Sequence, residues 1–281
     1  MVTLGPATTI GGMRVRVAGA AVDVAVPPAA ARVPGVAMAG FRGRAEDPVH
    51  LRMIPYPART VFVDLGDSLL VDDTDGTAKR GCVVVGMIAG SVRGRGRDVD
   101  LLQVRLSPLA AHAVLGGGPA GAVVSLEDLW GRDAERTRER LAGLRSWDDR
   151  FTVMAAALDR RLSAGKAMDP EVAHAWGRMV AARGRVRVER LAGEVGWSRK
   201  RLWSRFRAQV GLTPKRAAAL VRFDRAARRL AAGHSAARVA AETGFVDQSH
   251  LCREAMAIAG TTPRSVAAAP WLAVDDVAWP A

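Results

Sequence analysis

Side chains that could bind an anion are concentrated in one stretch of the chain. Between Arg183 and Leu230, fifteen residues are lysine or arginine and three are acidic, so this stretch carries +12 of the chain's net charge of +13. Guanidinium and ammonium groups at this density favour a polyanion, most often nucleic acid. The alternative that charge alone leaves open is an arginine-rich helix surface that faces only water.

The same pattern occurs twice in and after this basic stretch. Residues 191–196 read LAGEVG and residues 239–244 read VAAETG, and each copy ends in Gly-x-Thr-Pro, at 211–214 and 260–263. Each copy has an apolar helix face, a glycine turn, an aromatic residue and a capped second helix, which predicts two helix-turn-helix units. The one extra residue of the second copy falls in the turn, where it leaves the helix register intact.

The second helix of each unit is expected to have a buried side and an outward side. Leu202 and Phe206 are expected to be buried in the first unit, and Leu251 and Ala255 in the second. The residues expected on the outward side are Lys200, Trp203, Ser204 and Arg207 in the first unit, and Gln248, Ser249, Cys252 and Arg253 in the second. The first unit is strongly basic and the second is not. The first is therefore expected to supply most of the binding affinity, and the second to make polar contacts.

One helix is expected to join the two units. Thr213-Pro214 combines an N-cap with a first-position proline, and the helix pattern from Pro214 extends to about Gly233. A helix of roughly 18 residues is about 27 Å long, and neighbouring major-groove faces of B-DNA lie about 34 Å apart. This length is compatible with two units that enter successive grooves.

With these motifs the C-terminal hundred residues resemble the AraC/XylS family of transcriptional regulators. The resemblance is carried by LAGEVGWSRKRLWSRFRAQVGLTP, RFDRAARRL, GFVDQSHLCRE and GTTPR. It implies double-stranded DNA as the partner and two recognition helices in adjacent major grooves. The residues it implies for base contacts are Lys200, Trp203, Ser204, Gln248, Ser249, Cys252 and Arg253. The phosphate contacts expected beside them are Arg199, Arg201, Arg207, Lys215 and Arg216.

The second unit departs from the family at one core position. The family usually has phenylalanine where this chain has Ala255. Met256, beside it, could fill part of the missing volume because its side chain is flexible. If it does not, a looser second head with weaker specificity is expected.

The N-terminal part has the texture of a small β domain. Alternating runs such as MRVRVAGAAVDVAV, RTVFVDLGDSLLV and GCVVVGMIAGSV predict short strands, and Gly94 to Gly96 is expected to be a turn. Helices are expected over RDAERTRERLAGL, from Ser146 onward, and after Asp169-Pro170. LSPLAAHAVLG, LEDLWG and SWDDRF resemble, more faintly, the sensory regions of some of these regulators, which implies a cupin-like domain and helices that often dimerise.

The predicted fold class is therefore α+β, with a small β sandwich or barrel, a helical connector and an all-α double helix-turn-helix domain. The expected bounds are 1–125 for a sensory domain, 126–183 for the connector, 184–268 for the DNA-binding domain and 269–281 for a tail. Tryptophans in the tail, Trp271 and Trp279, are expected to dock on the rest of the protein. Arg52 could hold an anionic effector, although a surface position is the simpler expectation.

The sequence lacks the residue patterns of disulfide scaffolds, metal sites, common catalytic motifs and membrane spans. Two cysteines, Cys82 and Cys252, cannot make a disulfide scaffold or a cysteine zinc site, and they fit a reducing cytoplasm. The five histidines are scattered, so no metal site and no cofactor are expected. No catalytic residues are expected, since G-x-S-x-G and Walker patterns do not occur. The sequence shows neither an export signal nor an apolar run of about 18 residues, so no membrane span is expected.

Three hypotheses follow. The first is a sequence-specific transcriptional regulator in the cytoplasm, with RNA polymerase, a small-molecule effector of unknown identity and a second copy of the chain as further candidate partners. The second is an enzyme with a fused DNA-binding domain. The third is a non-specific architectural DNA-binding protein, which would share the basic stretch but would not need two distinct recognition faces.

Overall fold

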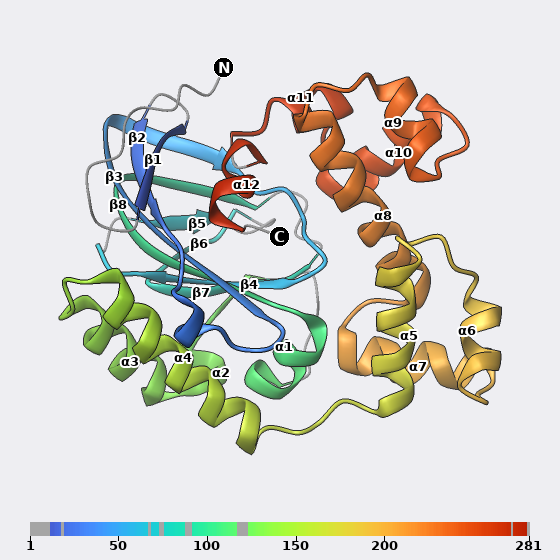
Figure 1. Ribbon diagram of the computed structural model, residues 1–281, viewed down its shortest axis with the longest axis horizontal. Helices are drawn as coiled ribbons and strands as arrows, with labels where there is room; N and C mark the ends of the chain where they lie inside the picture. The colour runs from blue at the N-terminus through green and yellow to red at the C-terminus, as the bar shows by residue number, and fades with distance from the viewer. Residues whose placement is uncertain are drawn as a thin grey trace.

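The computed structural model describes residues 12–17, 20–66, 69–72, 76–87, 92–116, 123–270 and 272–279. Figure 1 shows an antiparallel β domain with helices packed on it and, beside it, a helical C-terminal region. This arrangement confirms the predicted α+β class, with the β part first and the all-α part second.

The β domain is built on one antiparallel sheet. Its strands in the described ranges are β1 (Gly12–Val17), β2 (Ala20–Ala25), β3 (Val36–Arg52), β4 (Arg59–Asp64), β5 (Leu70–Asp72), β6 (Ala78–Arg80), β7 (Cys82–Val85), β8 (Arg93–Leu106) and β9 (Val123–Ser125). The strand order is β1-β2-β3-β8-β4-β7-β9, and β5 pairs with β6 and β8. The long strands β3 and β8 pair along most of their length, with a register shift between Arg44 and Val49.

Both faces of the sheet are buried, because successive side chains of a strand point to opposite sides. On β4, Val61 and Val63 belong to the apolar cluster that the helices cover, whereas Phe62 belongs to the cluster on the other face. Phe41 of β3 and Leu101 of β8 lie in that second cluster as well. The continuous apolar run of β4 therefore reflects burial on two sides.

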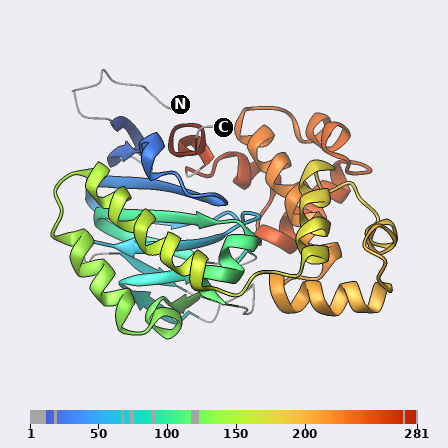
Figure 2. The same cartoon turned by 60° about the horizontal axis from the view of Figure 1, so that its bottom comes forward.

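Helices cover one face of the sheet (Figure 2). They are α1 (Pro108–Leu115), α2 (Glu127–Trp130), α3 (Arg132–Ala142) and α4 (Trp147–Ala164), and a short 3-10 helix, η1 (Ala29–Ala31), precedes β3. The predicted helices over α3 and α4 are confirmed, and the Ser146 side chain caps α4 by accepting the Asp148 N–H.

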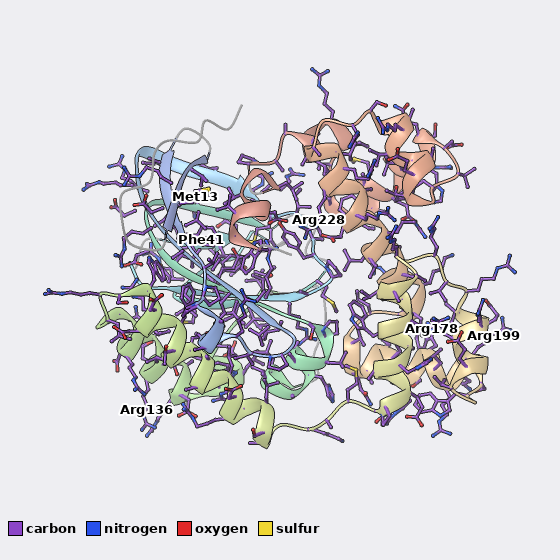
Figure 3. All side chains as sticks on the ribbon, viewed as in Figure 1. Met13, Phe41, Arg136, Arg178, Arg199 and Arg228 are labelled. Carbon is purple, nitrogen blue, oxygen red and sulfur yellow. The ribbon has the colours of Figure 1, made fainter. Side chains whose placement is uncertain are left out.

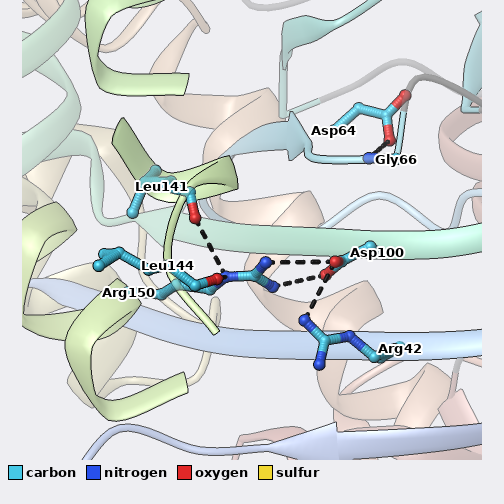
Figure 4. A network of polar contacts seen from close by, with 7 residues as sticks. All are labelled: Arg42, Asp64, Gly66, Asp100, Leu141, Leu144 and Arg150. Carbon is cyan, nitrogen blue, oxygen red and sulfur yellow. Dashed lines mark hydrogen bonds and ion pairs between the residues drawn. The ribbon is translucent and has the colours of Figure 1, made fainter. Parts of the chain in front are cut away.

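A buried arginine ties these helices to the sheet (Figure 4). Arg150 of α4 donates to both carboxylate oxygens of Asp100 on β8, at 2.6 and 3.2 Å. Its Nε donates to the carbonyls of Leu141, in the last turn of α3, and of Leu144, just after α3. Arg42 of β3 shares the Asp100 carboxylate at 3.1 Å. The paired charge and the capped carbonyls compensate for burial of the guanidinium.

The C-terminal region consists of helices within the described residues. They are α5 (Pro170–Ala181), α6 (Val188–Glu194), α7 (Arg199–Val210), α8 (Pro214–Ala231), α9 (Ala236–Thr243), α10 (Gln248–Ala259), α11 (Pro263–Ala267) and α12 (Leu272–Ala278). Helix α5 begins at Pro170, as predicted, and contributes Val172, Trp176 and Met179 to the core that α6 to α10 share. None of the helices in the described ranges is long and apolar enough to cross a membrane.

One turn prediction is wrong. Gly94 and Gly96 lie inside β8, where they pair with Leu51 and Val49 of β3. Gly94 also pairs with Val71 of β5, so the strand continues through the glycines between two neighbours. Backbone pairing on both sides outweighs the weak strand preference of glycine.

Candidate nucleic-acid interface

The first head, residues 188–210, comprises α6, a turn and α7. Gly196 has φ of +66°, a conformation that suits glycine at a sharp turn. Ser198 caps α7 by accepting the Arg201 N–H at 3.2 Å. Leu202 and Phe206 are fully buried. The local signals in the sequence thus produce the predicted helix-turn-helix.

The second head, residues 236–259, repeats this construction with α9 and α10. Gly244 is left-handed, with φ of +86°, and Phe245 is buried behind it. Asp247 caps α10 by accepting the His250 N–H at 2.7 Å. Leu251 and Ala255 are fully buried, as the repeat predicts. Two units of the same design therefore sit in one domain.

Helix α8 joins the heads. Thr213 caps it through the Arg216 N–H, and the 18 residues from Pro214 to Ala231 match the predicted length. Leu220 and Phe223 are completely buried in the core that both heads share. Because one continuous helix forms the spine of this core, the heads are held at a fixed separation.

The candidate base-contact residues lie on the solvent side of α7 and α10. In the first head they are Lys200, Trp203 and Ser204, and all are exposed. In the second head Gln248, Ser249 and Arg253 are exposed and Cys252 is partly buried. Each head thus presents its polar face outward, and contact of these residues with DNA remains a prediction.

Trp203 is the largest of these side chains. It is 44% exposed, and the Arg207 guanidinium lies over its ring at 5.2 Å from the centroid. An indole that is open to solvent beside a cation offers a surface for a sugar or base. Base contact by Trp203 stays a prediction.

The candidate phosphate-contact residues surround the first head. Arg199 lies 3.3 Å from Glu189, in an exposed ion pair that costs little to exchange. Arg201 lies over the Trp197 ring at 4.4 Å. The remaining members, Arg207, Lys215 and Arg216, are exposed.

Acidic residues in the basic stretch form ion pairs with basic residues of the same region. Glu194 of α6 accepts from Arg178 of α5 at 3.0 Å and also contacts His174 and Arg190, at 3.2 and 3.1 Å. The hydrogen bond from Arg178, followed by that from His174, lowers the pKa of Glu194 to about 2. Figure 3 labels Arg178 and Arg199 in this region. These pairs fix α6 on α5 and mask a negative charge beside the first head.

The residues predicted to contact DNA do not include one group of arginines between the heads. Burial and the charges of Arg183, Arg229 and Arg185 lower the pKa of Arg225, which places four cations together. The Arg185 stem packs so close to Gly244 that a Cβ there would lie 2.6 Å from it. The high positive charge of residues 183–230 indicated such a group, but the spacing of the arginines in the sequence does not show that these four lie close together.

Of the two alternatives for the core beside Ala255, the one in which Met256 fills the space does not occur. Met256 is 53% exposed, while Ala255 is completely buried. Consecutive helix residues point about 100° apart, so a side chain next to a buried one is directed outward. Ala255 itself is buried in the core that the two heads share.

Enlarging this residue is expected to destabilise the second head. Ala255→Phe restores the size that the family usually has, but in a core closed around alanine it should cost about 1–3 kcal/mol through overpacking. The check is the thermal midpoint of unfolding of the purified variant, with Ala257→Ser, at an exposed neighbouring position, as control. A higher midpoint for Ala255→Phe would reveal unfilled space and contradict this expectation.

The contacts of the remaining candidate residues outside the heads describe their surroundings. Arg52 lies at the domain boundary and donates to the Gly260 carbonyl at 2.9 Å, at the end of α10. Of the two cysteines, Cys82 is buried, which raises its pKa to about 12. In the described part of the chain, no three His, Cys, Asp or Glu side chains gather as metal ligands would.

Residues 191–269 match a family model described as a helix-turn-helix domain. No curated protein matches the chain. A solved structure of ToxT from Vibrio cholerae is 9% identical, with 85% of this chain and 98% of that chain covered and a TM-score of 0.49. A transcriptional regulator with an AraC-type DNA-binding domain from Chromobacterium violaceum is 24% identical, with 40% and 96% covered and a TM-score of 0.33.

The matched residues contain both α9 and α10 as well as most of the first head and all of α8. Two capped heads, joined by one helix and followed by Thr262-Pro263, occur in the order that the sequence motifs predict. Residues 191–269 therefore form a helix-turn-helix domain with two heads.

Proposed function

We propose that the protein regulates transcription by binding a specific double-stranded DNA sequence, with α7 and α10 in adjacent major grooves. The observation that carries this proposal is the repeated head, whose outward faces leave polar side chains free on a rigid support. Helix α8, at 18 residues, is about 27 Å long, close to the roughly 34 Å between neighbouring major-groove faces.

The two heads divide the work. The first head and α8 carry most of the positive charge, so their phosphate contacts supply affinity that does not depend on sequence. The second head carries Gln248, Ser249 and Arg253, which suit hydrogen bonds to base edges. Specificity should therefore fall mostly on the half-site that α10 reads.

Arg253→Ala tests this division. The Arg253 side chain is exposed, and among the described residues it has no hydrogen-bond or ion-pair partner. We expect the variant to lose about 1–3 kcal/mol of binding free energy and to relax the preference at one base pair. Binding-site selection with the variant and the unaltered protein measures both effects. The control is Arg136→Ala, on the far side of the β domain (Figure 3). Unchanged selectivity would remove Arg253 from the base contacts.

Regulation is proposed to enter through the β domain. A small-molecule effector bound there would change promoter occupancy by favouring one arrangement of the two domains over another. Helices α3 and α4 expose a charged surface that would serve a homodimer, and RNA polymerase is the partner that a regulator of transcription must influence. We place the protein in the cytoplasm, with its DNA target, where its two cysteines remain reduced.

The decisive experiment is sequencing of the fragments that the full-length protein retains from a pool of random DNA. A single enriched motif supports a sequence-specific regulator, and paired copies of the motif at a fixed spacing support a dimer. If retained and unretained fragments have the same sequence composition, the protein is a non-specific architectural DNA-binding protein and the proposal fails.

A further inference from the structure

An ion pair ties the second helix of the second head to the helix that joins the heads. Helix α10 lies against α8 (Figure 1). Nη2 of Arg222 on α8 donates to both carboxylate oxygens of Glu254 on α10, at 3.1 and 3.0 Å. The two side chains are only 17% and 22% exposed, so water and salt screen this pair less than a pair on the open surface.

The same guanidinium contacts two further segments. Nη1 of Arg222 donates to the carbonyl of Gly184, between α5 and α6, at 3.4 Å. The guanidinium also lies over the ring of Phe245, 5.0 Å from its centroid, in the turn of the second head. The chain at Gly184 is packed closely on α8, because a Cβ there would lie 2.3 Å from the carbonyl oxygen of Ala218. Arg222 therefore holds α10 and its turn against a fixed support.

The backbone of the turn is linked to the same carboxylate through His250. Nδ1 of His250 accepts the Val246 N–H at 3.3 Å, so the proton of the neutral ring is on Nε2. This Nε2 lies 3.6 Å from Oε1 of Glu254. The imidazole also packs edge-on against Phe245, with 5.4 Å between the ring centroids. A series of contacts thus runs from α8 through Glu254 and His250 to the turn before α10.

The candidate base contacts of the second head all lie between the two ends of this series, Val246 and Glu254. They are Gln248, Ser249, Cys252 and Arg253. Hydrogen bonds to base edges require side chains that are held within about 0.5 Å and 10–20° of the productive geometry. The contacts hold the recognition segment at its first turn and again two turns later, which limits both tilt and rotation of α10.

The first head has a tie of opposite polarity at the matching position. Arg205 occupies the position of Glu254, 49 residues earlier, and donates to both carboxylate oxygens of Asp169 at 2.7 and 2.9 Å. In each head this position therefore faces the body of the domain, whereas the candidate base contacts face outward. The two ties use different residues, so each can be removed without the other.

We propose that Arg222 and Glu254 are positioning residues that set the base selectivity of the second head by fixing α10 on α8, without touching DNA themselves. This inference rests on the proposed function and deepens it, because it names residues behind the recognition helix that control how sharply one half-site is read. An ion pair that only stabilised the fold would weaken both half-sites and the hold on phosphates together.

The test compares Glu254→Gln with the unaltered full-length protein on its selected DNA site. The α10 half-site is the one whose preference changes in Gln248→Ala or Arg253→Ala. Selectivity is the ratio of affinities for this site and for the site with one base pair changed in that half. It should fall roughly tenfold in Glu254→Gln, because α10 loses a charge-assisted contact that fixes it. Selectivity in the other half-site should not change.

Asp169→Asn is the matched control, since it removes one negative charge and the tie of the first head. It should leave selectivity in the α10 half-site unchanged, and its affinity for random duplex should stay within about twofold of that of Glu254→Gln. Arg222→Lys keeps the charge but loses the guanidinium fork, so it should lower the α10 selectivity as well. The double variant should be no worse than either single one, because both remove the same contact.

Several results would overturn the inference: unchanged selectivity in Glu254→Gln, an equal loss in both half-sites, or additive effects in the double variant. If Arg222→Lys does not fold, the comparison of Glu254→Gln with Asp169→Asn decides alone. A motif that the unaltered protein and Glu254→Gln select equally sharply removes only this inference. If the unaltered protein selects no motif, the proposed function fails and the inference fails with it.

Discussion

Replacing Phe206 by alanine is expected to unfold the first head and to remove DNA binding with it. Phe206 is completely buried, in a cluster with Leu202, Leu220 and Phe223. Truncation of a fully buried phenylalanine removes its transfer free energy and leaves a cavity, for a loss of about 3–5 kcal/mol. That is a large part of the roughly 5–15 kcal/mol by which a typical protein is stable.

The measurement for Phe206→Ala is denaturant unfolding beside a DNA-binding titration of the same preparation. Because Phe206 lies in the core that α8 shares, a loss of stability should lower the unfolding midpoint of the whole helical region. Ala208→Ser is the control, since Ala208 is exposed on the same helix and its change should stay within about 0.5 kcal/mol. An unaltered midpoint in Phe206→Ala would show that the first head does not depend on this core.

The helix-turn-helix units could be predicted because their signals are local. Ser198 and Asp247 cap their helices, and Gly196 and Gly244 take positive φ, within a few residues of the motifs that indicate them. Repetition at a nearly constant offset strengthened each local signal with an independent copy. Short-range capping and turn chemistry therefore carried most of this prediction.

The β domain was harder to predict because its strands depend on distant partners. The three quoted apolar runs correspond to strands, but the long β3 and β8 contain arginine, glycine and, in β3, Pro48. Their pairing with each other, over tens of residues of separation, overrides these weak preferences. The glycines of β8 accordingly looked like a turn.

The contact of α12 with the β domain could not be predicted from sequence. Asp275 of α12 accepts a hydrogen bond from Arg105 of β8, 170 residues away, and no repeat or motif links them. The docking expectation for the tail tryptophans is confirmed for Trp279, which lies over Arg105, whereas Trp271 lies outside the described residues. Long-range ion pairs between domains leave no local pattern in the chain.

A steep dependence on salt is the second large effect expected. Each neutralised phosphate contributes a slope of about −0.9 in log affinity against log salt. The candidates Arg199, Arg201, Arg207, Lys215 and Arg216 then predict a slope of about −4.5. Affinity should fall by a factor of roughly 500 between 50 and 200 mM salt. Fluorescence anisotropy titrations of one labelled duplex over this range measure the slope.

Variants assign this slope to residues. Lys215→Ala combined with Arg216→Ala should make the slope shallower by about 1.8, and the distant Arg136→Ala should leave it unchanged. A flat response in the unaltered protein would contradict DNA binding through the basic stretch. A slope much steeper than −4.5 would instead mean that Arg183, Arg185 and Arg225, which lie together between the heads, also reach phosphates. In that case residues 182–187, which connect α5 to α6, would belong to the interface. The DNA would then have to pass close to the turn of the second head, where Arg185 packs against Gly244.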